Sequence, residues 1–158
     1  MRLWHVDLID VLPYKQLLSQ WREILYIKGT IIRKGSPKHS LVNIVMNYPL
    51  SDFKVYADIV TAEMVRRNYH VNLEKYREFM SWNGENKFYI GDVEDMTIYD
   101  KPGNFSISYV IFPGWHNEAY LRQCLANLKE KFDRGAISET EWTKIDEKFH
   151  GIIVEMKI

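Results

Sequence analysis

The sequence of 158 residues lacks the features of a secreted or membrane protein. Cys124 is the only cysteine, so no disulfide can form within the chain. No apolar run approaches the roughly 18–20 residues that span a membrane. The first residues meet Asp7 and Asp10 and lack the uninterrupted apolar stretch of a signal peptide. These absences predict a cytoplasmic protein without a membrane partner.

Motifs for metals and cofactors are missing as well. The sequence has no cluster of Cys and His, no His-Glu-x-x-His and no glycine-rich phosphate loop. We therefore expect neither a metal nor a cofactor.

The chain has no net charge, because 21 basic residues balance 21 acidic ones. A neutral chain is unusual for a DNA-binding protein, since neutralised phosphates supply much of the affinity. The charges are nevertheless polarised. Residues 1–40 hold seven Lys/Arg against three Asp/Glu, whereas residues 79–158 hold nine against thirteen. The positive charge is concentrated in the first forty residues.

Periodic apolar residues predict a first helix from about Pro13 to Lys28. Pro13 suits a first helical turn and Gly29 suits a C-terminal stop. One side is apolar and carries Tyr14, Leu17, Leu18, Trp21, Ile24 and Leu25. The other side is polar and carries Lys15, Gln16, Ser19, Arg22, Glu23 and Tyr26. We expect a basic loop after this helix, with Arg33, Lys34, Lys38 and His39.

The remaining pattern is mainly helical. Further helices are expected at about residues 51–67 with Ser51 as N-cap, 73–82 after Asn72, 117–133, and 138–148 behind the capping box Ser138-Glu139-Thr140-Glu141. Residues 41–46 could be a strand or the start of a helix, and residues 84–113 could hold short strands or ordered loops. The composition, 46% hydrophobic and 14% aromatic, supports a packed core. The sequence predicts one mainly α domain over residues 1–158, with about five helices and minor β or irregular structure in residues 84–113.

The polar face of the first helix carries the candidate site. Arg22 and Glu23 stand side by side there, a pattern that by itself is typical of a solvated surface. His5 could contact phosphate or serve a structural role. The basic residues of the helix at 117–133 are interpreted as a solvated face; they are Arg122, Lys129, Lys131 and Arg134.

The sequence around Arg22 and Glu23 resembles the N-terminal region of the pyrimidine-dimer DNA glycosylase family. Leu17, Trp21, Arg22 and Glu23 match the family's helix, with Gln20 in place of an acidic residue, and Gly29 and the basic loop follow at the family's spacing. Two later segments extend the resemblance, the second of them to a bacterial branch of the family: Tyr48-Pro49 with the helix that closes at Asn68-Tyr69, and His116–Leu121 with Asn127–Lys131.

The resemblance implies a DNA repair glycosylase with AP-lyase activity, which acts on damaged bases such as pyrimidine dimers in double-stranded DNA. The family's nucleophile is the N-terminal α-amine, here that of Met1, which attacks the sugar and forms an imine. An α-amine has a pKa of about 7.7–8.0, against about 10.4 for lysine, so a useful fraction is neutral. Glu23 would be the catalytic carboxylate and Arg22 would clamp a phosphate. The DNA-binding set would comprise Arg2, Arg22, Tyr26, Arg33, Lys34, Lys38 and His39.

Two departures from the family's pattern leave an alternative open. The second residue is Arg2 rather than a small residue, so Met1 is expected to be retained. Tyr26 stands where the family has a second arginine, which removes a phosphate contact but offers a ring for base stacking. The alternative is a catalytically inactive member that serves as a nucleic-acid or protein interaction module.

Overall fold

The computed structural model describes residues 2–34, 40–90, 96–101 and 104–158. These residues are mainly helical, as predicted, and no described helix is long and apolar enough to cross a membrane. The elements in chain order are the 3₁₀-helix η1 (Val6–Val11), α1 (Tyr14–Lys34), α2 (Ser40–Met46), α3 (Leu50–Arg66), α4 (Leu73–Ser81), the 3₁₀-helix η2 (Gly84–Asn86), β1 (Met96–Lys101), β2 (Asn104–Tyr109), α5 (Glu118–Asp133) and α6 (Glu139–Met156).

Helix α1 is longer than the sequence predicted. The prediction of a stop at Gly29 is wrong, because the helix continues to Lys34. Ile27 and Ile31 are buried, so the apolar stripe continues on both sides of Gly29. A glycine within a helix costs about 1 kcal/mol, which is less than the stabilisation from burying the two isoleucine side chains. Arg33 and Lys34 therefore lie in the last helical turn, where cations favour the helix dipole. The prediction that Arg33 and Lys34 belong to a basic loop is wrong, because both residues are helical.

The later helices follow the sequence pattern more closely. Asn72 caps α4 and Ser138 with Glu141 forms the predicted capping box of α6. The cap of α3 was assigned wrongly: Pro49 precedes this helix, so Ser51 lies within its first turn. The apolar stripe of α3 is buried as predicted; it comprises Phe53, Tyr56, Ala57, Val60 and Met64.

In three segments the structure either differs from the prediction or decides between the predicted alternatives. Residues 41–46 are helical, as part of α2. The last helix is interrupted close to the predicted end at Lys148, because Phe149 leaves the helical conformation (φ −115°, ψ 26°); a second helical stretch, which includes the apolar tail, continues to Met156. Between residues 84 and 113, β1 and β2 form an antiparallel hairpin in which Met96 pairs with Tyr109.

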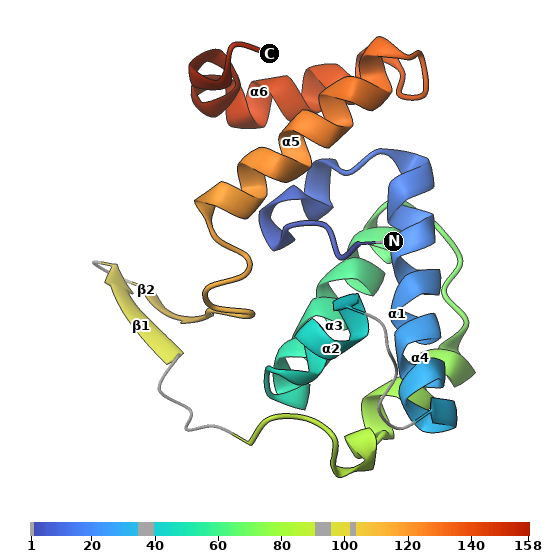
Figure 1. Ribbon diagram of the computed structural model, residues 1–158. Coiled ribbons are helices and arrows are strands. Elements are labelled where there is room, and N and C mark those ends of the chain that lie inside the picture. Colours follow the sequence, from blue (N-terminus) through green and yellow to red (C-terminus); the bar gives the residue numbers. More distant parts are fainter. Residues whose placement is uncertain (1, 35–39, 91–95, 102–103) are drawn as a thin grey trace.

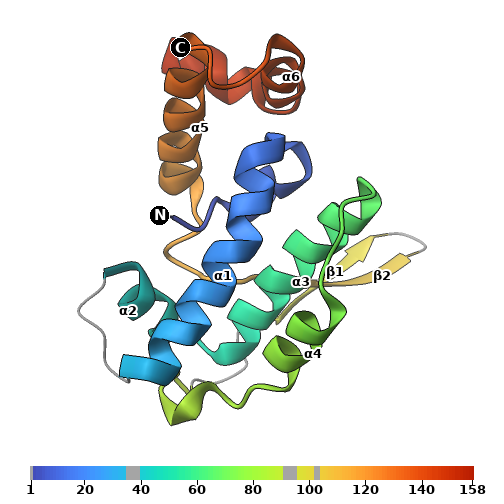
Figure 2. The same ribbon diagram turned by 90° about the vertical axis from the view of Figure 1, so that its right-hand side faces the viewer.

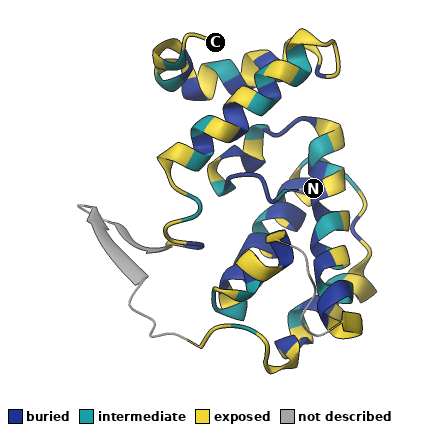
Figure 3. Cartoon of the chain, in the orientation of Figure 1, coloured by how far each residue is buried: buried dark blue, intermediate teal, exposed yellow. Residues whose placement is uncertain are grey.

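The N-terminal segment runs between the two layers of helices. Helices α1 and α3 pack against each other, while α5 and α6 lie on the other side of η1 (Figures 1 and 2). Burial is concentrated where these layers meet (Figure 3), and Leu3, Trp4 and His5 are buried there although they belong to no helix or strand. Their backbone must find hydrogen-bond partners among the side chains around it.

Candidate active site

Glu23 lies half-buried on α1 and lines a cleft of about 330 Å³. The cleft lies between α1, the N-terminal segment and α5. Its lining residues are Arg2, Trp4, Lys15, Gln16, Ser19, Glu23, Asn127 and Lys131. The structure thus brings together side chains that are more than a hundred residues apart in the sequence.

The charges in this cleft are unequal. Glu23 is the single carboxylate in the lining, and Arg2, Lys15 and Lys131 are the cations. Arg2 also lies over the ring of Trp4, with its guanidinium carbon 5.1 Å from the ring centre. A cleft with a surplus of cations attracts an anionic ligand such as a phosphate, while the carboxylate remains available for proton transfer.

The environment of Glu23 changes its acidity. Burial raises the pKa of this carboxyl group, because a low-dielectric surrounding disfavours the charged form. Hydrogen bonds from the Arg2 backbone N–H and the Gln20 side-chain amide act in the opposite direction. A carboxyl group whose pKa is above the ordinary value can exchange protons closer to neutral pH.

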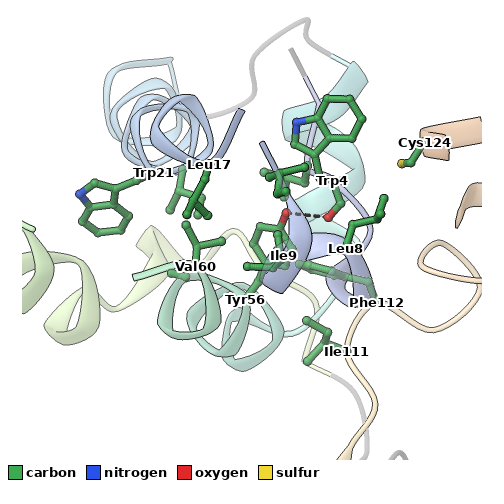
Figure 4. Packing of buried hydrophobic residues seen from close by; sticks show 14 of the residues in the cluster. Trp4, Leu8, Ile9, Leu17, Trp21, Tyr56, Val60, Ile111, Phe112 and Cys124 are labelled. Carbon is green, nitrogen blue, oxygen red and sulfur yellow. Dashed lines mark hydrogen bonds between the residues drawn. The ribbon is translucent and has the colours of Figure 1, made fainter. Parts of the chain in front are cut away.

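The N-terminal segment beside Glu23 is held by side chains. The buried amide of Gln20 accepts from the Trp4 N–H at 2.7 Å and donates to the Arg2 carbonyl at 3.0 Å. The Tyr120 hydroxyl donates to the Leu3 carbonyl at 2.6 Å. The Tyr56 hydroxyl donates to the Trp4 carbonyl at 2.6 Å, and Figure 4 draws this hydrogen bond as a dashed line. Consecutive peptide groups are thereby fixed without any neighbouring strand.

Two histidines, the buried His5 and the partly buried His116, hold the backbone at the start of η1 in the same way. Nδ1 of His5 accepts from the Asp7 N–H, and Nδ1 of His116 accepts from the Val6 N–H, each at 3.1 Å. The two imidazole rings stack with their centres 5.3 Å apart. Burial lowers the pKa of both, that of His116 to about 3. Because His5 is buried, its ring is not at the surface where it could contact a phosphate. Its contacts assign it a structural role.

The other predicted DNA-binding residues of α1 do not line the cleft. Arg22, Tyr26, Arg33 and Lys34 are exposed. Helical geometry puts Arg22, Tyr26 and Arg33 on one stripe that runs past Glu23, with Arg22 and Arg33 about 16 Å apart along the axis. Within the described residues, none of these cations forms an ion pair.

Three predicted site residues, Met1, Lys38 and His39, lie outside the described residues.

The sequence reasoning missed Gln20, Asn127 and Lys131. A signal for Gln20 was present, because the polar residue falls on the buried side of α1 between Leu17 and Ile24. No such signal existed for Lys131, which was interpreted as part of a solvated face. Lys131 is partly exposed, as a solvated face requires, but it also lines the cleft. The three other cations of this region instead pair with carboxylates: Arg122 with Glu118 and Glu155, Lys129 with Asp133, and Arg134 with Glu130.

Comparison with known proteins gives one finding. The family model for pyrimidine dimer DNA glycosylase matches residues 1–77, which hold the N-terminal segment, α1, α2, α3 and the first part of α4. No curated protein and no solved structure gives a significant match. The matched segment includes Glu23 and Gln20, whereas α5 and its contribution to the cleft lie outside it. The chain is therefore similar to the pyrimidine dimer DNA glycosylase family over residues 1–77, just under half of its length.

Proposed function

We propose that the protein is a DNA repair glycosylase with AP-lyase activity, which removes a damaged base and then cleaves the strand at the abasic sugar. Its substrate would be double-stranded DNA with pyrimidine dimers or related damaged bases. The observation that carries the proposal is the position of Glu23: it lies half-buried in a cation-lined cleft, against the first peptide groups of the chain.

The proposed nucleophile is the α-amine of Met1. The Arg2 backbone N–H bonds to the Glu23 carboxylate. Covalent geometry allows the nitrogen of a preceding residue to lie only about 3–4 Å from that N–H nitrogen. The proposed amine is thus attached next to Arg2, which lines the same cleft as Glu23.

The chemistry divides between the amine and the carboxylate. The neutral amine attacks C1′, the glycosidic bond breaks, and the base leaves with its electron pair and takes up a proton. Loss of an amine proton and opening of the sugar ring give a cationic imine, which the Glu23 carboxylate stabilises. Glu23 then accepts a proton from C2′, and β-elimination breaks the bond between C3′ and its phosphate oxygen. Water hydrolyses the imine and regenerates the amine.

Access to C1′ requires that a nucleotide leaves the base stack, because the sugar carbon is shielded in regular duplex DNA. Arg2, Lys15 and Lys131 would hold the phosphates that flank the extruded nucleotide. The exposed stripe with Arg22, Tyr26 and Arg33 would continue along the backbone, with Tyr26 free to stack on a base. Lys34 and, as the family resemblance implies, Lys38 and His39 would bind further phosphates.

Borohydride trapping tests the mechanism, because it reduces the imine to a stable bond between protein and DNA. We expect a covalent adduct on duplexes that contain a cyclobutane dimer or an abasic site. Glu23→Gln should reduce the rate of adduct formation by about 10²-fold or more, the range of general acid–base and electrostatic contributions. Glu74→Gln is the matched control, since Glu74 is an exposed carboxylate on α4 away from the cleft.

The outcomes separate the proposal from its alternative. An undiminished adduct in Glu23→Gln would refute the assigned role. Salt-dependent binding to duplex DNA without any adduct would support the noncatalytic interaction module. Intact mass spectrometry of the trapped adduct after proteolysis identifies the residue that carries the sugar. A sugar on a lysine rather than on Met1 would refute the assignment of the nucleophile.

A further inference from the structure

Gln20 is fully buried, and every polar group of its side chain has a partner. Its Oε1 accepts from the Trp4 N–H at 2.7 Å and lies 2.8 Å from the Tyr56 hydroxyl. Its Nε2 donates to the Arg2 carbonyl at 3.0 Å and to Oε2 of Glu23 at 3.1 Å. One side chain thus connects two peptide groups of the N-terminal segment with the carboxylate of the candidate site.

Only an amide satisfies these four contacts. Oε1 faces an N–H donor, and Nε2 faces a carbonyl and a carboxylate, which fixes the orientation of the amide. In the arrangement of this chain, an ionised glutamate, the class of residue that the family's pattern has at this position, would leave the Arg2 carbonyl without its donor and would put a second carboxylate against Glu23. A leucine would fill the same volume but leave the buried Trp4 N–H unpaired.

We infer that Gln20 is a positioning residue of the proposed reaction, which fixes the first peptide groups of the chain and the Glu23 carboxylate relative to each other. This inference rests on the proposed function. Gln20 itself is covered by protein and does not line the cleft, so it acts through the groups it holds.

Gln20 can position these groups because few bonds separate its side chain from the carboxylate and from the start of the chain. The amine and the carboxylate must approach the same sugar. Gln20 binds the carboxylate directly, and it binds the carbonyl of Arg2, the residue next to the one that carries the proposed amine. A displacement of about 1 Å between reacting groups can lower a rate about 10²-fold. The Tyr56 hydroxyl supports the arrangement from α3, sharing its single proton between Gln20 and the Trp4 carbonyl.

The test compares Gln20→Glu and Gln20→Leu with Thr30→Val as control. Thr30 is also buried on α1 and donates to the Tyr26 carbonyl at 2.9 Å, but it does not contact the site. We expect the Gln20 variants to form the trapped adduct about 10²-fold more slowly at saturating abasic DNA, with a Kd for that DNA within about twofold of the wild type. Thr30→Val should retain the rate.

A titration of Glu23 by ¹³C NMR gives a readout that a merely structural role would not change. In the wild type, the amide of Gln20 lowers the pKa of this carboxyl group. Gln20→Glu should therefore raise it, because a hydrogen-bond donor is replaced by a like charge. Thr30→Val should leave it unchanged. Near-ultraviolet circular dichroism and thermal unfolding show whether each variant folds, and Gln20→Glu answers the question if Gln20→Leu does not fold.

The two hypotheses fail in distinguishable ways. If the wild type forms no adduct, the proposed function is refuted and the positioning role falls with it. If the wild type forms the adduct and a folded Gln20→Glu forms it equally fast, or shows an unchanged Glu23 titration, only the positioning role is refuted.

Discussion

Acidification should destabilise the protein through His116, because this ring is buried in its neutral form. Nδ1 accepts from the Val6 N–H, so it carries no proton, and Nε2 has no partner among the described residues. Burial, and then the charge of His5, lower the pKa of His116 to about 3. The bond to Val6 is lost when Nδ1 takes up a proton, since it then becomes a donor facing a donor.

The magnitude follows from the difference between the folded and unfolded states. An unfolded histidine has a pKa of about 6.5, so below this pH the unfolded state binds a proton that the folded state does not. The free energy of unfolding therefore falls as the pH drops from about 6.5 towards about 3. Between pH 6.5 and pH 4.5, the contribution of this single ring is about 2 kcal/mol. The lowered pKa of His5 acts in the same direction, whereas the raised pKa of Glu23 opposes it.

The assay is urea unfolding of the wild type and of His116→Asn at several pH values. Asparagine keeps an acceptor near the position of Nδ1 but does not titrate. The variant should be less stable at pH 7, because it loses the ring contacts with Trp115, Tyr120 and Phe112. Its stability should nevertheless fall less steeply, with about 2 kcal/mol less loss between pH 6.5 and pH 4.5. Parallel pH dependences of the two proteins would refute the reasoning.

Three further changes have expected outcomes. Lys131→Ala should weaken binding to duplex DNA and reduce the slope of log K against log salt by about 0.9. Arg134→Ala should change this slope less, because the Arg134 guanidinium lies beside Glu130. Equal slopes for the two variants in a salt titration would contradict the role of Lys131. Ser138→Ala removes the capping box and should cost about 1 kcal/mol in thermal unfolding, and no change would indicate that the helix end is held by other contacts. Arg67→Met should lower the free energy of unfolding in urea by about 2–3 kcal/mol, because Arg67 donates to three carbonyls at the end of η1 and to Glu63. A decrease below about 0.5 kcal/mol would mean that water replaces these hydrogen bonds.

Local patterns in the sequence were sufficient for most helices. The stripe of α3 and the caps at Asn72 and Ser138 depend on residues within one or two turns, so they can be identified without knowledge of the fold. The stop at Gly29 failed for a nonlocal reason. A glycine ends a helix only when nothing beyond it gains from continuing, and here Ile31 gains by packing into the core.

The site was predictable in part. Glu23 could be identified through the family's pattern, and the family match covers it. Lys131 could not, because its neighbours on α5 have the same charge and the same surface pattern. Only the packing of α5 beside the N-terminal segment separates the cation of the cleft from those that pair with carboxylates.

The sequence by itself determined the mainly helical class, the similarity of residues 1–77 to the pyrimidine dimer DNA glycosylase family and the helix that carries Glu23, since all three depend on residues close together in the chain. The tertiary structure decided how the N-terminal segment lies beside that carboxylate. This segment makes no strand or helix of its own, and its backbone is paired with side chains from α1, α3 and α5. Such bonds join residues up to 117 positions apart, so no local pattern could specify them.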